Sequence, residues 1–481
     1  MLARRQPISF CFALLSSLLL IAGSTISCGP SAPAKDDILL ISLDTLRSDH
    51  LSSYGYRRET SPFLDKLASE GARFAEAHSS ASNTAPSHMS LLTGLDPLAH
   101  GIRPVGGARE KVTGLSPRSP ILAEILKSVG YQTVGIADNG YVMTSMGFDR
   151  GFEYFDNQRT SLPQKLTMLS VKLKEVDPDK PLFVFFHTYE PHAPYLPPPP
   201  FHGRFTSESY TGPFRKRYDD LASLPVHVAW KQKGDFLKTW EGMSEVDLDF
   251  LRGLYDEGIA YTDSRIKRLW SIWSRRRNPE KTLLIIVSDH GEGFNEHGQL
   301  GHKYGLYSEL LRVPLIVRGP GIQPIVIEQP VSLTDVVPTI LDYLQLPSST
   351  MQGESFLSLM RGNDSESQRF AVSQLNAKRG LHDSIVSDNL HLMRWNRPEG
   401  NKLDLFDNTV DRAEKVNSAD ARKADVTRLE KTLEQRRELG ETHHERYPNL
   451  VNGELSEQDR VDLEALGYTD GQGYIEPDED E

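Results

Sequence analysis

Four apolar runs, each followed at once by a polar or ionisable residue, constrain the fold more than any other feature of this sequence. In a chain of 481 residues, the runs occupy residues 38–43, 133–137, 182–186 and 283–287. Such near-continuous apolar character is typical of strands buried on both faces of a parallel sheet. Helical patterns lie between the runs, and one is predicted to begin with Ser61 as N-cap and Pro62 at the first helical position. The sequence therefore predicts an α/β fold with a large, mostly parallel sheet between helices.

The residues that follow these runs are of the kinds that carry chemistry. Two of the runs are followed directly by Asp44 and His187, and a third is followed by Ser288, Asp289 and His290. The carboxyl ends of parallel strands meet at one edge of an open sheet, and ligands bind beyond that edge. We therefore expect these side chains to gather in one site.

Composition and charge narrow the classes of function. Hydrophobic residues make up 38% of the chain and charged residues 25%, which is ordinary globular usage and excludes collagen-like, wholly disordered and multi-span membrane proteins. The 66 acidic and 54 basic side chains give a net charge of −12. Binding to nucleic acid through neutralised phosphates is therefore not expected, while the oligomeric state is left open.

The N-terminal segment predicts export from the cytoplasm. Residues 1–27 contain Arg4 and Arg5, then an apolar run, then small residues before Cys28, which is typical of a secretory signal peptide. A membrane-spanning anchor is the alternative, but serines interrupt a run that barely reaches the ~20 apolar residues of a span. The only other cysteine, Cys11, lies in the same segment, so no disulfide framework is expected.

The sequence TISCG at the end of this segment resembles the lipobox of bacterial lipoproteins. The resemblance implies that Cys28 becomes the acylated first residue, followed by a tether over residues 28–36. We expect a protein of the bacterial cell envelope, on the periplasmic or outer surface and attached to the membrane by its lipid. A freely secreted protein is the alternative.

The rest of the chain is predicted to form two folded parts and a tail. A catalytic domain is expected over residues 37–346, a smaller α+β subdomain over 347–469 and a disordered acidic tail over 470–481. Within the subdomain, residues 370–375 and 384–395 have the character of strands. A polar helix with an apolar stripe is predicted over residues 419–440, ending at Gly440.

The strand-end residues have the composition of a divalent-cation site. Asp44, Asp289 and His290 offer hard carboxylate oxygens and one imidazole nitrogen, a donor set open to manganese, zinc, magnesium or calcium. Taken alone, an aspartate that ends a strand is equally typical of a helix N-cap. A third segment supports the cation site: Thr84 precedes Pro86 and a helical pattern to Thr93, which places its hydroxyl at a helix N-terminus where an anion is favoured.

Taken together, the three segments resemble the sulfatase family within the alkaline phosphatase superfamily. Its strand-one motif, aspartate-aspartate-x-arginine-x-aspartate, is similar to residues 44–49, and its late motif with a downstream glutamate-histidine-glycine is similar to residues 289–298. Its nucleophile motif, cysteine or serine-x-proline-serine-arginine before leucine-leucine-threonine-glycine, is similar to residues 84–88 and 91–94. The resemblance implies an alkaline phosphatase-like fold and metal-dependent hydrolysis of anionic esters.

The departures from the family pattern bear on mechanism. Active sulfatases of this family make a formylglycine from cysteine or serine at the position of Thr84, and carry arginine at the position of His88. Threonine would oxidise to a ketone, so aldehyde-hydrate chemistry is not expected. Thr45 replaces the second aspartate of the metal motif, and residues 138–140 replace a lysine-tryptophan-histidine segment. A threonine nucleophile resembles instead superfamily members that act on phosphodiesters, such as nucleotide pyrophosphatase/phosphodiesterases and phosphoglycerol or phosphoethanolamine transferases.

Three further residues are candidate substrate contacts. Lys303 falls where sulfatases place a lysine on the transferring group, and its charge suits a phosphoryl or sulfuryl oxygen. His187 and His192 follow a predicted strand and are candidates for leaving-group acid or substrate ligand. Alternatively, the two histidines form a second metal site with Glu190 and His302.

The leading hypothesis is an extracytoplasmic metal-dependent hydrolase of phosphoester or phosphonoester substrates. In it, Thr84 is both nucleophile and metal ligand beside Asp44, Asp289 and His290, because metal coordination lowers the pKa of a hydroxyl. The substrate is expected to be an anionic ester of a small molecule, a glycan or a lipid headgroup. Three alternatives stay open: a sulfuric ester hydrolase, a transferase of phosphoryl-linked headgroups and a non-enzymatic binding protein.

Overall fold

In the computed structural model, the chain from Lys35 onward forms one compact unit. The structure describes residues 35–103, 112–224, 242–302, 304–348, 350–363, 368–377, 380–451, 455–456, 459–461 and 463. The signal peptide, Cys28 with most of its tether, Lys303 and the acidic tail lie outside the described residues.

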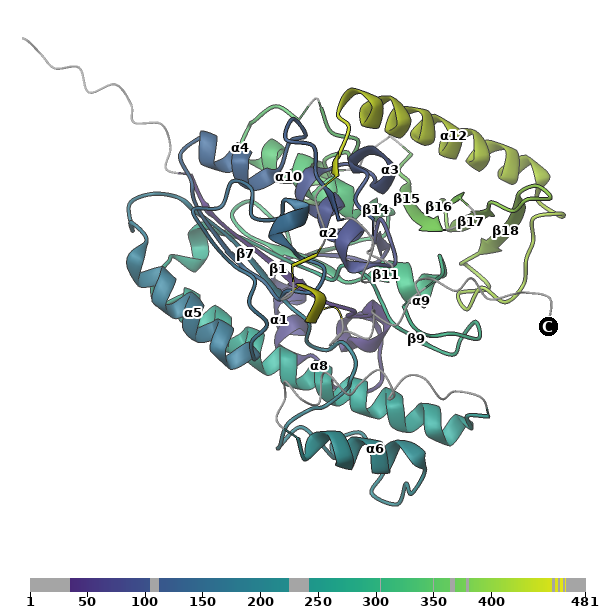
Figure 1. Cartoon of the computed structure of the whole chain (residues 1–481), viewed down its shortest axis with the longest axis horizontal. Coiled ribbons are helices and arrows are strands. Elements are labelled where there is room, and N and C mark those ends of the chain that lie inside the picture. The colour runs from purple at the N-terminus through teal and green to yellow at the C-terminus, as the bar shows by residue number, and fades with distance from the viewer. Residues whose placement is uncertain are drawn as a thin grey trace, which may run out of the picture. The chain divides into compact units, whose positions relative to one another are not determined.

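A mostly parallel eight-stranded sheet forms the centre of the fold (Figure 1). Its only antiparallel strand in the described structure is β12, which pairs with β8 on one side and β2 on the other. All other neighbours are parallel. The predicted fold class is therefore confirmed. In spatial order the strands are β13 (Ile325–Ile327), β2 (Ala72–Phe74), β12 (Leu315–Arg318), β8 (Thr282–Val287), β1 (Asp37–Leu43), β7 (Leu182–Thr188), β5 (Gln132–Ile136) and β6 (Tyr154–Asp156).

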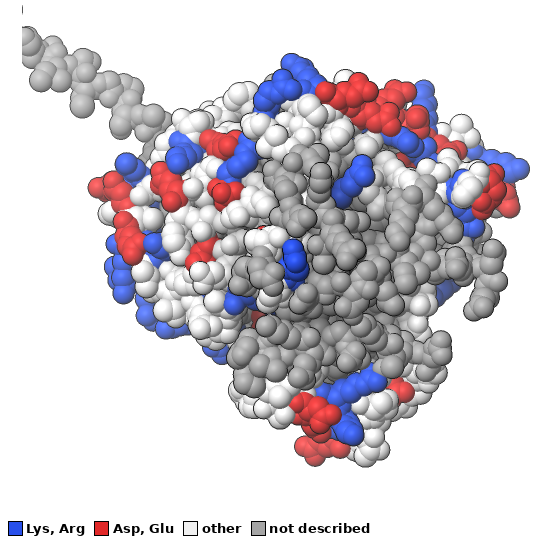
Figure 2. Space-filling view, in the orientation of Figure 1, with Lys and Arg blue, Asp and Glu red and all other residues white. Residues whose placement is uncertain are grey.

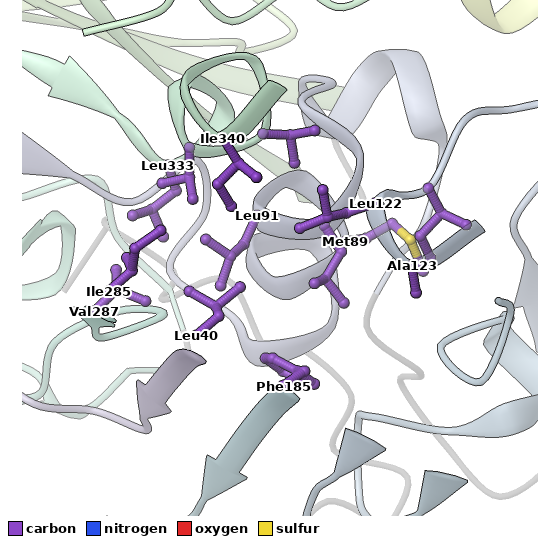
Figure 3. Close-up of a cluster of buried hydrophobic side chains, with 14 of the residues drawn as sticks. Leu40, Met89, Leu91, Leu122, Ala123, Phe185, Ile285, Val287, Leu333 and Ile340 are labelled. Carbon is purple, nitrogen blue, oxygen red and sulfur yellow. The ribbon is translucent and has the colours of Figure 1, made fainter. Parts of the chain in front are cut away.

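Both faces of the central strands are buried, which explains their continuous apolar runs. Along β1, Ile38 and Leu40 point into one hydrophobic cluster, and Leu39 and Ile41 into the other. Figure 3 shows the first cluster, where Leu91 lies between Leu40 and the side chains of Leu333 and Ile340. Helices α2 (Thr84–Thr93), α4 (Leu122–Ser128), α10 (Val336–Tyr343) and α11 (Leu357–Met360) cover this face, and α1 (Pro62–Glu70), α5 (Leu162–Glu175), α6 (Pro213–Ala222) and α8 (Glu245–Trp273) cover the other (Figure 1).

Helix α1 begins at Pro62 after Ser61, as predicted, but its cap comes from another helix. The Asp263 carboxylate on α8 accepts the N–H groups of Phe63 at 3.1 Å and Leu64 at 2.8 Å. The Ser61 hydroxyl instead donates to Asp65 at 3.0 Å. A contact from a distant part of the chain thus provides acceptors for the N–H groups of the first turn, and the local sequence does not reveal this contact.

The second part of the chain forms a four-stranded antiparallel sheet covered by α12 (Lys423–Arg446) (Figure 1). The predicted strand over residues 384–395 is a hairpin of two strands. Asp388 and Asn389 form its turn with φ of 51° and 60°, a left-handed conformation that asparagine and aspartate tolerate. The strands are β15 (Ala371–Ala377), β16 (Gly380–Ser387), β17 (Leu390–Trp395) and β18 (Lys402–Asp407).

Helix α12 does not end at Gly440, so that prediction was wrong. Gly440 is buried inside the helix, where a Cβ atom would lie 3.3 Å from the Leu98 side chain. The glycine serves close packing of α12 against α3 (Pro97–His100) rather than a helix stop. One turn earlier, the Arg436 guanidinium donates to Asp96 in two bonds of 3.0 and 2.8 Å. The smaller part is thereby tied to the segment that follows α2.

The boundary predicted after residue 346 stays a prediction. Phe356 and helix α11 belong to the hydrophobic cluster of the large sheet, while Val372 and Leu392 of the small sheet form a separate cluster with α12. The remaining short elements are β3 (Ala77–His78), β4 (Thr113–Gly114), β9 (Gly293–Phe294), β10 (Leu300–Gly301), α9 (Ser308–Leu311), β11 (Arg312–Val313), β14 (Val331–Ser332), β19 (Leu450–Val451) and the 3₁₀ turns η1 (Ser48–His50), η2 (Ser52–Tyr54), η3 (Thr144–Met146), η5 (Pro279–Lys281) and η6 (Leu333–Asp335).

Charged residues of both signs are mixed on the visible surface, most clearly along the edge formed by α12 (Figure 2). Across the described ranges, no helix has the combination of length and apolarity that a membrane crossing requires.

Candidate active site

The predicted cation ligands meet at the carboxyl edge of the large sheet. Strands β1 and β8 are paired in parallel with Ser42 opposite Val287, so the residues just beyond them, Asp44 and Asp289, become neighbours. One ligand atom from each of Asp44, Asp289 and His290 lies within 4.8 Å of the others, and all three residues are fully buried. The strand-end argument thus correctly places Asp44 beside Asp289 and His290, which lie about 245 residues later in the sequence.

The hydrogen bonds of Asp289 and His290 leave one carboxylate oxygen and one ring nitrogen for a metal ion. Asp289 Oδ1 accepts the N–H groups of Thr45 at 3.2 Å and His290 at 3.0 Å. Asp289 Oδ2 accepts no hydrogen bond from the described part of the chain. The His290 ring places Nδ1 2.9 Å from the Gly291 carbonyl oxygen, and an N–H at Nδ1 leaves the Nε2 lone pair for a metal ion.

A divalent cation fits this donor set. Two carboxylates with 0% exposure lie side by side, and burying such charges is costly unless an opposite charge compensates them. Two carboxylates and one imidazole suit manganese, zinc, magnesium or calcium. Asp44, Asp289 and His290 would hold the ion.

Thr84 lies at the N-terminus of α2 and faces the same cluster. Its Oγ1 is 3.4 Å from Asp44 Oδ2 and 3.2 Å from His290 Nε2. In the first turn, Pro86 has no N–H and the Ser87 N–H is donated to the Asn83 carbonyl at 3.1 Å. The first N–H groups of a helix have no intrahelical acceptor, so the Thr84 and Ala85 amides can receive an anionic oxygen.

His88 lies in the candidate site, where the sequence analysis did not place it. With an N–H at Nδ1, its ring donates to the Thr84 carbonyl at 2.9 Å, and Nε2 accepts the Ser42 hydroxyl at 2.8 Å. Nδ1 also lies 3.4 Å from Asp289 Oδ2. Burial lowers the pKa of His88, which keeps the ring neutral. The spacing of four residues from Thr84, one helical turn, is the sequence signal that could have revealed this contact.

His187 lies inside β7 rather than beyond it, and it supports Asp44. Its Nδ1 accepts the Asp138 N–H at 3.3 Å, and its Nε2 lies 3.5 Å from Asp44 Oδ2. Burial, together with the nearby His88 and Lys165, holds the pKa of His187 well below its usual value. A fully buried neutral ring does not suit the expected role of leaving-group acid.

Asp138 stands where sulfatases usually have the lysine-tryptophan-histidine segment, and it forms an ion pair with Lys165. The fully buried Lys165 ammonium lies 2.9 Å from Asp138 Oδ1, while Asp138 Oδ2 accepts the Tyr189 N–H at 3.0 Å. This ion pair links α5 to the ends of β5 and β7. No sequence pattern indicated it, because a lysine on a helix is usually solvated.

His192 forms a pair with His302. Their Nε2 atoms are 3.0 Å apart, and their Nδ1 atoms face the carbonyl oxygens of Ala193 at 2.6 Å and Ser82 at 3.3 Å. With an N–H at each Nδ1, one additional proton shared between the Nε2 atoms makes this contact a hydrogen bond. The His302 ring also contacts the His290 ring, with centroids 4.1 Å apart, so the pair adjoins the cation site.

The second metal site expected from these histidines and Glu190 does not appear among the described residues, where one cluster with metal-ligand spacing occurs, at Asp44, Asp289 and His290. Burial, with the charge of Asp138 adding to it, raises the pKa of Glu190 to about 7. Lys303 and Cys28 lie outside the described residues, so their predicted roles stay predictions.

Arg47 joins the two segments that carry the ligands. Its guanidinium binds both carboxylate oxygens of Asp49 at 2.9 and 2.7 Å, Glu296 at 2.6 Å and the Glu292 carbonyl at 2.8 Å. Although burial alone would raise it, the charge of Arg47 holds the pKa of Asp49 well below its usual range. The loops after β1 and β8 are therefore fixed to each other beside the site.

A candidate cation site of two carboxylates and an imidazole, with a hydroxyl beside it at a helix N-terminus, is an arrangement that suits metal-dependent hydrolysis of esters. The sulfatase family model matches residues 36–346, and the chain belongs to this family. A second model, described as N-sulphoglucosamine sulphohydrolase, C-terminal, matches residues 295–439. The resemblance to the sulfatase family is confirmed, and with it the assignment as a hydrolase acting on ester bonds.

The chain is similar to named proteins of the alkaline phosphatase superfamily and to sulfatases. The multifunctional alkaline phosphatase superfamily protein PehA of Trinickia caryophylli is 24% identical over 383 residues, covering 64% of this chain and 74% of that protein. A sulfatase of Formosa agariphila is 21% identical over 430 residues, covering 80% of this chain and 83% of that protein.

Solved structures confirm the alkaline phosphatase-like fold. The phosphonate monoester hydrolase of Agrobacterium radiobacter superposes with a TM-score of 0.65 at 20% identity, covering 88% of this chain and 99% of that one. A structure in complex with its substrate D-glucosamine-2-N,6-O-disulfate superposes with a TM-score of 0.67 at 18% identity, covering 85% of this chain and 98% of that one.

Proposed function

We propose that this protein hydrolyses phosphodiester or phosphonate ester substrates, with Thr84 as the nucleophile. The position of Thr84 Oγ1, 3.4 Å from Asp44 Oδ2 and 3.2 Å from His290 Nε2, carries the proposal. Threonine bears a hydroxyl that can attack phosphorus but cannot form the aldehyde of a formylglycine. The similarity to PehA and to a phosphonate monoester hydrolase supports this choice of substrate class.

When bound, a divalent cation supplies positive charge to the reacting oxygens and lowers the pKa of a nearby hydroxyl. In the proposed reaction, Thr84 Oγ1 loses its proton to solvent and forms a bond to phosphorus, while the bond from phosphorus to the leaving oxygen breaks. The amides of Thr84 and Ala85 stabilise the charge on a non-bridging oxygen. In the second step the oxygen of a water molecule bonds to phosphorus, the bond from phosphorus to Oγ1 breaks, and Oγ1 takes up a proton from solvent to become a hydroxyl again.

The remaining residues move protons or orient these groups. The proton shared by His192 and His302 passes to the leaving oxygen, and the water that attacks the ester restores it. His187 and His88 position Asp44 and Thr84 through their neutral rings. Lys303, as a fixed positive charge, is proposed to bind the substrate anion.

A sulfuric ester hydrolase is the second candidate, because the C-terminal model that matches residues 295–439 is that of a sulphohydrolase. A substrate panel separates the two: aryl sulfate, aryl phosphate monoester, aryl phosphodiester and aryl phosphonate, each with manganese, zinc, magnesium and calcium. We expect kcat/KM for the diester or phosphonate to exceed that for the sulfate by more than about tenfold, equivalent to about 1.4 kcal/mol of transition-state stabilisation. Faster cleavage of the sulfate would instead establish the second candidate.

We further propose that Cys28 is acylated and holds the protein on the bacterial cell envelope. The lipobox-like sequence before Cys28 supports this location. In cells fed a labelled fatty acid, the wild-type protein is expected to carry label and to sediment with membranes, whereas Cys28→Ser loses the label. Cys11→Ser is the matched control and should behave as wild type, since Cys11 lies in the predicted signal peptide. Equal labelling of Cys28→Ser would refute the proposal.

A further inference from the structure

Helices α5 and α8 form a basic groove on the side of the molecule away from α2. The groove has a volume of about 520 Å³. Figure 2 shows basic side chains along the lower left margin, where α5 lies in Figure 1. Its lining contains five cationic residues: Lys174, Arg265, Arg268, Arg275 and Arg276.

The cations of this groove are not neutralised by the protein. Lys174, Arg268, Arg275 and Arg276 are exposed, and none forms an ion pair with any residue that the structure describes. The groove is therefore locally basic in a chain whose net charge is −12. An unpaired cluster of four positive charges favours an anionic ligand.

Acidic residues at the same end of the two helices are engaged elsewhere. Glu175 binds Lys172 at 2.7 Å, and Glu280 binds Arg318 at 2.8 Å. The loop between α5 and β7 also carries Asp177 and Asp179, which do not line the groove. The groove therefore keeps its positive potential.

Apolar side chains lie among these cations. Val171 on α5 is 44% exposed, and Ile272 on α8 and Leu166 on α5 also line the groove. A ligand that is both anionic and partly apolar matches this mixture better than a fully hydrated polyanion does.

The position of the groove relative to the start of β1 bears on the kind of ligand that it binds. Helices α5 and α8 lead into β7 and β8, so their basic C-terminal ends lie at the edge where the parallel strands begin. At this edge the Arg277 Nε donates to Asp37 Oδ2 at 2.7 Å, at the start of β1. The described chain, which begins at Lys35, therefore starts beside the basic end of the groove, whereas Asp44 and Thr84 lie at the opposite edge.

We propose that the groove binds the phosphate headgroups of anionic phospholipids and holds the domain against the membrane, with the active site facing away from it; this proposal rests on the acylation of Cys28 proposed above. Anionic headgroups attract a basic surface, and a lipid anchor combined with such a surface holds a protein more firmly than either one alone. The substrate would then come from the aqueous side, not from the leaflet to which the protein is attached.

The test compares binding of the full-length protein to two kinds of vesicle, phosphatidylcholine alone and phosphatidylcholine with phosphatidylglycerol. The ratio of the two partition coefficients cancels the contribution of the acyl chain, which inserts into both. In Arg268→Glu/Arg275→Glu this ratio is expected to fall by about 30-fold or more, since two favourable charges are lost. Turnover of a soluble aryl ester should be unchanged, so the result is independent of the proposed catalytic chemistry.

Lys423→Glu/Lys431→Glu is the control, because it makes the same charge change at two exposed positions of α12. An equal fall in the control would show a general charge effect and overturn the proposal, as would an unchanged ratio in the groove variant. Loss of heparin binding without loss of vesicle binding would assign the groove to soluble polyanions and also overturn it. If the charge-reversal variant unfolds, Arg268→Gln/Arg275→Gln provides the same comparison with a smaller expected fall.

Discussion

Replacing Thr84 by alanine is expected to lower kcat/KM for an aryl phosphodiester by at least about 10³-fold, the scale on which enzymes lose activity with their nucleophile. The reason is positional: no other hydroxyl in the described structure lies within hydrogen-bonding distance of both Asp44 and His290. The measurement is steady-state kinetics with saturating cation. Trapping a phosphorylated Thr84 by mass spectrometry after rapid quenching would identify the intermediate directly.

Two matched variants make this result specific. Thr84→Ser keeps the hydroxyl and should retain most of the activity. Thr93→Ala makes the same deletion at the other end of α2, where the hydroxyl donates to the Met89 carbonyl at 2.6 Å, and should change stability more than turnover. If Thr84→Ala turned over the diester at the wild-type rate, Thr84 would not be the nucleophile and the proposed mechanism would fail.

Removal of the divalent cation is expected to abolish turnover and to lower the thermal midpoint of unfolding. Without the ion, the fully buried Asp44 and Asp289 carboxylates repel each other inside the fold. Restoring the ion at about 100 times its Kd should stabilise the folded state by about 2.7 kcal/mol. Thermal unfolding before and after chelation measures this difference without relying on activity.

Asp289→Asn should remove most of this cation-dependent stabilisation. Asp256→Asn is the control: this carboxylate is equally buried, but His50, Tyr56 and Arg58 bind it at 2.6 to 2.7 Å. The control should have a lower thermal midpoint of unfolding both with and without the ion, but the difference between its two midpoints should match that of the wild type. A cation effect that survived intact in Asp289→Asn would rule out Asp289 as a ligand.

The parts of the site that sequence could predict are those fixed by strand register. Asp44 and Asp289 lie one and two residues beyond the ends of two adjacent parallel strands, so the apolar runs alone place them at one edge. His187 shows the limit of the same reasoning. Its strand continues to Thr188, so His187 is a residue of the sheet whose ring lies beside Asp44, and it does not project beyond the end of the strand.

Contacts made across the fold account for what sequence did not predict. The pairing of Lys165 with Asp138 and the packing of Gly440 on Leu98 each depend on elements brought together only by tertiary structure. From local sequence, a lysine is expected in solvent and a glycine at a helix end. In the structure both residues are buried, Lys165 beside Asp138 and Gly440 within α12. The hairpin within residues 384–395 was missed for a local reason, because aspartate and asparagine provide a left-handed turn without glycine.

The two bonds between Arg436 and Asp96 also restrict how this protein can be recombined with its relatives. Asp96 lies three residues after the end of the helix that begins with Thr84, so the C-terminal part of the chain supports the far end of that helix. A chimera that exchanges the C-terminal part would have to bring an arginine to the same place, or leave a buried carboxylate unpaired. A chimera should therefore take Arg436 and Asp96 from the same parent protein.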